Sequence, residues 1–163
     1  ALASLGVEDA GLAAALAQRW EDAALAADVI ALAGAAGTLE ALTAAGVRTA
    51  LVCDTGFSSG RVVRVLLDRV GLLDHLEVTT FSDEVGVPKP HPLMFTTTLD
   101  ALGVDAGGSV HVGDLRRTDV AGARAVGMGT VRISWANDDT ADLPEADAVA
   151  ASHGDLVRLL GVA

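Results

Sequence analysis

The sequence predicts an α/β fold in which a doubly wound parallel sheet carries helices on both faces. Beyond Gly46, short apolar runs alternate repeatedly with stretches of helical periodicity. This alternation is typical of parallel sheets, because each helix returns the chain to the start of the next strand. The 163 residues suffice for one such domain with a sizeable core.

The chain before Gly46 is rich in alanine, the strongest helix former. Its patterns predict helices over residues 9–27 and 37–45. Gly46 suits the residue that closes the second helix, because glycine adopts the left-handed conformation found there.

The predicted sheet begins after Gly46. Residues 49–53 form an apolar run typical of a buried parallel strand, and a helix is expected over 59–70, with Ser59 as its candidate N-cap. The further predicted elements are a strand at 78–81, a helix from Pro92 to Gly103, a strand at 110–112, a loop at 113–118, a helix at 119–126, strands at 131–133 and 146–149, and a last helix at 155–160. Ligands of such folds bind at the carboxyl ends of the strands, so chemistry is expected there.

Composition excludes several classes of protein. Asp and Glu number 22 against 11 Lys and Arg, and a net charge of −11 does not suit binding to a nucleic-acid backbone. No apolar run is long enough to span a bilayer, so we expect no membrane partner. The single cysteine excludes an internal disulfide and fits a reducing cytoplasm, where we expect the protein to reside.

The first predicted strand ends in Cys53, Asp54, Thr55 and Gly56. Backbone amides at a glycine-containing turn before a helix can bind an anion such as phosphate, and the Thr55 hydroxyl adds a donor. The alternative is an ordinary turn between a strand and a helix.

Lys89 is the only lysine of the chain, and three prolines surround it. Proline restricts the backbone, so the ammonium group is held in place to neutralise a phosphate or a buried carboxylate. The alternative is a rigid surface loop.

Asp114 and Asp119 follow the strand predicted at 110–112. Two carboxylates in one loop can bind a hard cation such as Mg²⁺. For Asp119 the alternative is the N-cap of the next helix. We interpret His111 as a hydrogen-bonded core histidine and His91 as a helix-entry residue.

Three segments together, 49–56, 82–95 and 111–128, resemble the haloacid dehalogenase-like (HAD) hydrolase superfamily, and the resemblance extends over about residues 37–160. It implies a Rossmann-like core and a phosphatase that acts on a small phosphate ester. Lys89 would stabilise the nucleophile and the transferring phosphoryl group. Asp114 would hold Mg²⁺, with Asp119 as the second acid.

The resemblance also implies a division of the chain. Residues 1–36 are similar to the remnant of a helical cap with its linker, and 37–163 to the α/β core. One motif departs from the family pattern, because Cys53-Asp54 stands where the family has Ser or Thr followed by Asn. Either Thr55 supplies the hydroxyl, or phosphate binding is weakened.

The Asp-x-Asp motif that carries the family's nucleophile does not occur in this sequence, and the one carboxylate pair at that spacing is Glu145/Asp147. In the family this motif lies on the central strand. Its loss would leave two inner strands with unpaired backbone groups or force them to pair with each other. We therefore expect the chain to be the carboxyl-terminal part of a longer enzyme, or to meet another chain that supplies or covers the missing strand.

Two other functions are considered. The first is a catalytically inactive HAD-like module that binds a partner or an anion, which the absent nucleophile and Cys53 favour. The second is a phospho-accepting receiver domain, in which the lysine follows the acids. Here Lys89 precedes Asp114, so the order of motifs argues against it.

Overall fold

The computed structural model describes residues 6, 8–56 and 58–162. Its strands pair in parallel throughout, as the sequence predicts, but they form two sheets. β1 (Ala50–Cys53) pairs with β2 (Val78–Phe81), and β3 (Val110–Gly113) pairs with β4 (Gly129–Ile133), which pairs with β5 (Ala148–Ala150). Within the described residues β1 has β2 as its single strand neighbour, and β3 has β4. The predicted parallel α/β architecture is confirmed, and β1 and β3 each lack the second neighbour that a central strand would supply, as the absent motif led us to expect.

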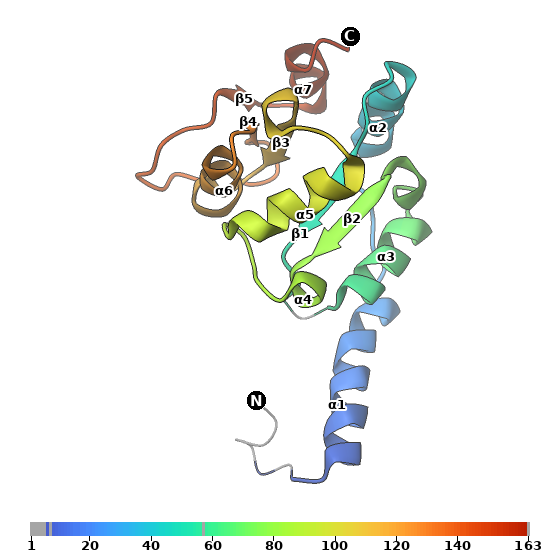
Figure 1. The fold of residues 1–163 in the computed structure, drawn as a ribbon. Coiled ribbons are helices and arrows are strands. Elements are labelled where there is room, and N and C mark those ends of the chain that lie inside the picture. The colour runs from blue at the N-terminus through green and yellow to red at the C-terminus, as the bar shows by residue number, and fades with distance from the viewer. Residues whose placement is uncertain (1–5, 7, 57, 163) are drawn as a thin grey trace.

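Helices cover both sides of these strands (Figure 1). They are α1 (Ala10–Asp22), α2 (Ala35–Ala44), α3 (Gly60–Arg69), α4 (Ser82–Val85), α5 (Pro92–Leu102), α6 (Ala121–Ala125) and α7 (His153–Leu159). Single turns of 3₁₀ helix span Ala23–Ala26, Leu73–His75 and Ala106–Gly108. None of the helices in the described ranges is long and apolar enough to cross a membrane.

The helix α5 joins the two sheets. It packs against β1 and β2, and the ring of Phe95 on α5 meets the ring of His111 on β3 edge-on, at 5.1 Å between centroids. Phe95 and Met94 are almost fully buried, and Ala123 of α6 completes this core cluster. The helices α2 and α7 are also in contact, and there the Thr38 hydroxyl lies 2.9 Å from Nδ1 of His153. The two sheets therefore have fixed places relative to each other without a ladder between β1 and β3.

The helix α1 projects away from the rest of the molecule (Figure 1). Its apolar residues Leu12 and Leu16, four positions apart and so on one face, are 52% and 41% exposed. The assignment of residues 1–36 to a cap remnant remains a prediction.

Two helix starts differ from expectation. Ser59 makes no side-chain cap bond; its hydroxyl donates to Glu21 instead, and the carboxylate of Asp83 accepts from the Gly60 amide at 3.1 Å. The helix expected from Asp119 begins later, at Ala121, after a π-helical turn over Arg116–Val120. Asp119 lies inside that turn and is buried, so its interpretation as an N-cap is wrong.

Candidate active site

The polar segments singled out in the sequence meet at the carboxyl ends of the strands. The loop that follows β2 crosses to the end of β1, where the amide of Lys89 donates to Oδ1 of Asp54 at 2.8 Å. The Lys89 side chain continues to the segment after β3, where its Nζ lies 2.7 Å from Oδ1 of Asp119. Lys89 thus connects the ends of two strands from different sheets.

The pair formed by Lys89 and Asp119 is nearly inaccessible to water, with side chains 13% and 5% exposed. His111 adds its Nε2 at 3.0 Å from Oδ1 of Asp119, and the Leu115 amide donates to Oδ2. Burial raises the pKa of Asp119, but the His111 hydrogen bond and the positive charge of Lys89 outweigh it, so this pKa lies well below its usual range. The carboxylate is therefore ionised and holds the ammonium group in one position.

Gly113 is required where β3 passes Asp119. A Cβ at this position would lie 2.4 Å from Cγ of Asp119, which is closer than two non-bonded carbon atoms approach each other. The glycine that precedes Asp114 in the sequence therefore allows the carboxylate of Asp119 to pack against the strand.

Asp114 has a different partner from Asp119. Its Oδ2 accepts from the side-chain amide of Asn137 at 2.7 Å, and Asn137 comes from the loop after β4. Sequence analysis did not single out Asn137. The rule that selected Asp114, a polar residue after a parallel strand, applies to Asn137 as well and would have found it.

The described residues contain no group of three or more His, Cys, Asp or Glu side chains arranged to hold a metal ion. Asp119 is directed to Lys89 and His111, whereas Asp114 is directed to Asn137. Mg²⁺ is usually bound through one or two carboxylates together with substrate phosphates and water, so a single carboxylate at a strand end suits it. Asp114 fits this description, and the joint role predicted for Asp114 and Asp119 stays a prediction.

Thr55 has partners within the protein. Its hydroxyl donates to Oδ1 of Asp83 at 2.9 Å, and its amide donates to the Ser82 hydroxyl at 2.8 Å. Because Asp83 also accepts from the Gly60 amide, one carboxylate engages both the hydroxyl and the start of α3. Sequence analysis did not identify Asp83 as the group at this helix start.

Cys53 ends β1 with a half-buried thiol that donates weakly to the carbonyl oxygen of Asp54. Burial raises the pKa of this thiol, which keeps it neutral. A Cβ on Gly56 would meet nothing within 4 Å, so the backbone there borders open space. The phosphate-binding roles predicted for Cys53, Asp54, Thr55 and Gly56 remain predictions.

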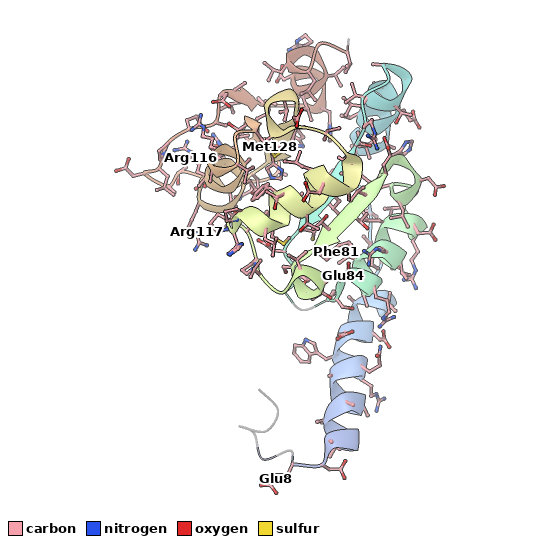
Figure 2. All side chains as sticks on the ribbon, viewed as in Figure 1. Glu8, Phe81, Glu84, Arg116, Arg117 and Met128 are labelled. Atoms are coloured by element: carbon pink, nitrogen blue, oxygen red, sulfur yellow. The ribbon has the colours of Figure 1, made fainter. Side chains whose placement is uncertain are left out.

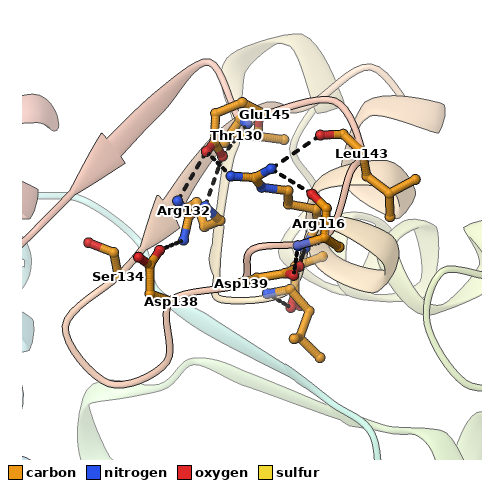
Figure 3. A network of polar contacts seen from close by, with 12 residues as sticks. Arg116, Thr130, Arg132, Ser134, Asp138, Asp139, Leu143 and Glu145 are labelled. Atoms are coloured by element: carbon orange, nitrogen blue, oxygen red, sulfur yellow. Dashed lines mark hydrogen bonds and ion pairs between the residues drawn. The ribbon is translucent and has the colours of Figure 1, made fainter.

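Glu145 and Asp147, the acids with the spacing of the nucleophile motif, both have structural partners. Glu145 pairs with Arg132 and Arg116, and the hydrogen bond from Arg132 lowers the pKa of Glu145 to about 2 (Figure 3). Asp147 accepts from the amide and the hydroxyl of Thr130. Both acids are therefore engaged by partners other than Lys89, Asp114 and Asp119.

Residues 2–127 match the family described as haloacid dehalogenase-like hydrolase. The chain belongs to this family. Among solved structures, a HAD phosphatase from Thermococcus onnurineus superposes with a TM-score of 0.67 and 34% identity over 77% of this chain and 55% of that one. L-2-haloacid dehalogenase from Xanthobacter autotrophicus, 23% identical over 98% of this chain and 71% of its own, shares the fold with a TM-score of 0.69.

Curated relatives of this HAD-family chain include phosphatases. It is 31% identical to haloacid dehalogenase-like hydrolase domain-containing protein 3 of Bos taurus, over 91% of this chain and 57% of that protein. It is 38% identical to ribulose-1,5-bisphosphate 5-phosphatase of Halopiger xanaduensis, over 58% of this chain and 38% of that enzyme. The chain therefore spans little more than half of the length of the first of these relatives and less of the second.

Proposed function

We propose that this chain provides the phosphoryl-binding side of a Mg²⁺-dependent phosphatase that acts on a small phosphate ester. The observation that carries the proposal is the Lys89 ammonium group, held 2.7 Å from Asp119 at the strand ends where ligands of such sheets bind. The names of several relatives, among them ribulose-1,5-bisphosphate 5-phosphatase and phosphoglycolate phosphatase, support the same class of substrate.

Lys89 would neutralise the negative charge that develops on the phosphoryl oxygens. An ammonium group has three donors, and the contact to Asp119 uses one of them. Since Asp119 and the Lys89 backbone are both held, the donors need no reorganisation when phosphate arrives, which is the condition for strong electrostatic stabilisation.

Asp114 is the residue of this chain that would hold Mg²⁺. When bound, the ion supplies charge neutralisation to the phosphoryl group, in the manner of a Lewis acid. Asp119, with its oxygens directed to Lys89, His111 and the Leu115 amide, would act through the position of Lys89.

The nucleophile, an Asp that would form an aspartyl-phosphate, is not assigned to this chain. We propose that it arrives on a strand placed between β1 and β3, from a longer form of the protein or from another chain. A parallel strand there would hydrogen-bond to both neighbours, and its last residue would reach the edge where Lys89 lies.

A catalytically inactive module that binds a partner or an anion is the second candidate. The internal bonds of Thr55 to Ser82 and Asp83, and the thiol at Cys53, favour it because they leave fewer free donors for phosphate. The two candidates are distinguished by turnover, because only the phosphatase would hydrolyse a phosphate ester.

The test is hydrolysis of p-nitrophenyl phosphate with and without Mg²⁺ by the protein that contains this chain and the nucleophile strand. We expect Mg²⁺-dependent turnover that falls by about a hundredfold or more in Asp114→Asn and in Lys89→Met, the range seen when one electrostatic stabiliser is removed. Asp142→Asn, an exposed acid outside the site, serves as the control and should leave turnover unchanged. Full activity in Asp114→Asn would refute the metal role, and absence of turnover in the unaltered protein would favour the inactive module.

A further inference from the structure

Asn137 joins the proposed metal ligand to an ion-pair network. We propose that Asn137 is a positioning residue for Asp114, and that Arg132 sets the place of Asn137 through Asp138. This inference rests on the proposed function, in which Asp114 holds Mg²⁺. It assigns a role to the loop after β4, which the sequence motifs leave without one.

Arg132 lies on β4 and is 4% exposed. Its guanidinium donates through Nε to Glu145 at 2.8 Å and through Nη1 to Asp138 at 2.9 Å (Figure 3). A guanidinium presents donors in a rigid fork and stays charged at every working pH, so it fixes both acids in direction as well as distance. Asp138 is the chain neighbour of Asn137, so the Arg132 contact constrains the loop beside the Asn137 side chain.

Arg116 holds the same loop through further contacts, and it shares the Glu145 carboxylate with Arg132. Its amide donates to Oδ2 of Asp139 at 2.7 Å, and its guanidinium reaches Glu145 at 2.7 Å and the carbonyl of Ala141 at 2.8 Å. Arg116 follows Asp114 by two residues. The chain is therefore anchored close to both ends of the contact between Asn137 and Asp114.

These anchors matter because Asn137 itself is exposed. A solitary hydrogen bond at the surface contributes little, since water competes for both groups. When the loop is already fixed, holding the amide beside Asp114 costs only the freedom of the Asn137 side chain and none of the backbone. It occupies one carboxylate oxygen, Oδ2, and leaves the other to serve as the ligand atom. Removing a residue that hydrogen-bonds to a metal ligand typically lowers metal affinity by about ten- to a hundredfold.

The first measurement is a Mg²⁺ titration of the protein that contains this chain and the nucleophile strand, with binding monitored by NMR at the backbone amide of Asp114. Asn137→Ala should weaken Mg²⁺ binding by about tenfold or more, with an unchanged melting temperature. Asp142→Asn, an exposed acid of the same loop, is the matched control and should bind as the unaltered chain does. Unaltered affinity in Asn137→Ala would overturn the inference.

The second measurement follows the side-chain amide of Asn137 itself and needs no metal. Asp138→Asn removes one charge from the Arg132 contact while leaving the pair with Glu145, so the fold should survive. We expect the Asn137 side-chain amide to exchange slowly with water in the unaltered protein, because it is bonded to Asp114, and to exchange faster in this variant and in Asp114→Ala. Slow exchange retained in Asp138→Asn would overturn the role of Arg132.

The two measurements separate this inference from the proposed function. If the unaltered protein that contains this chain and the nucleophile strand binds no Mg²⁺, the metal role of Asp114 fails, and the amide exchange still decides whether Arg132 and Asp138 hold Asn137 in place. If the chain binds Mg²⁺ and Asn137→Ala binds it equally well, the positioning role alone fails.

Discussion

Lys89 and Asp119 form an ion pair from which water is largely excluded. Removing Lys89 leaves the buried Asp119 carboxylate with its hydrogen bonds to His111 and the Leu115 amide but without its ammonium partner. Breaking a buried ion pair in this way typically destabilises a protein by about 3–5 kcal/mol. We expect Lys89→Met to lower the free energy of unfolding by that amount at pH 7, as measured by urea denaturation.

The double variant Lys89→Met/Asp119→Asn should regain most of this loss, because the remaining side chains carry no charge. Arg117→Met is the control, since Arg117 is exposed on the same segment as Asp119 and projects from the surface (Figure 2). We expect it to change stability by less than about 0.5 kcal/mol. Equal stability of Lys89→Met and the control would contradict the buried pair.

At the scale of the element, α6 approaches α5 so closely that its Gly122 has no room for a side chain. A Cβ there would lie 2.4 Å from the Phe95 ring and 3.0 Å from Cα of Pro90. Although alanine favours a helix over glycine by about 1 kcal/mol, overpacking of a core typically costs about 1–3 kcal/mol. We expect Gly122→Ala to be destabilised in thermal unfolding.

Gly37→Ala is the matched control for that variant. Gly37 also lies in a helix, α2, but a Cβ there would meet nothing within 4 Å. The change should therefore raise the melting temperature slightly, because only the helix preference operates. If Gly122→Ala raised the melting temperature as Gly37→Ala does, close packing of α6 against α5 would be excluded.

We expect the network of Arg132, Glu145 and Asp138 to make the stability of the fold vary with pH in the acid range. The folded-state pKa of Glu145 is lowered to about 2, below its usual 4.5, by Arg132. A lowered pKa stabilises the fold fully above about pH 4.5, and this stabilisation is lost as pH falls toward 2. Glu145→Gln should therefore flatten the fall in melting temperature between those pH values, whereas Glu40→Gln, an exposed acid on α2, should not.

At the scale of the whole molecule, two sheets are held at fixed places by helices while β1 and β3 each lack a second strand neighbour among the described residues. Edge strands expose alternate backbone amides that have no partner. Hydrogen exchange should therefore be fast at alternate amides of β1 and β3 and slow at those shared between β1 and β2. If all amides of β1 and β3 were protected from exchange, these strands would have second pairing partners in solution, and the prediction of open edges would be wrong.

The helices and strands follow closely from local sequence. The strand at 78–81 has the predicted bounds, the helix from Pro92 ends before Gly103 as expected, and Gly46 adopts the left-handed conformation with φ of 74°. These features depend on apolar periodicity and on residues with few backbone options, which a short window of sequence contains. The π-helical turn before α6 depends instead on the burial of Asp119 against Gly113, Lys89 and His111, which no local pattern records.

The candidate site divides in the same way. Lys89, Asp114 and Asp119 stand out in the sequence because of their residue types and their positions after strands, and those properties are local. Their partners come from 30 residues away for Asp119 and Lys89, and 23 for Asp114 and Asn137. The contact of Thr55 with Asp83 spans 28 residues. The strand ends are distant in the sequence, and their arrangement in the fold decides which partner each carboxylate has. Asp119 contacts the lysine, Asp114 the Asn137 amide and Asp83 the start of α3, and these assignments required the folded molecule.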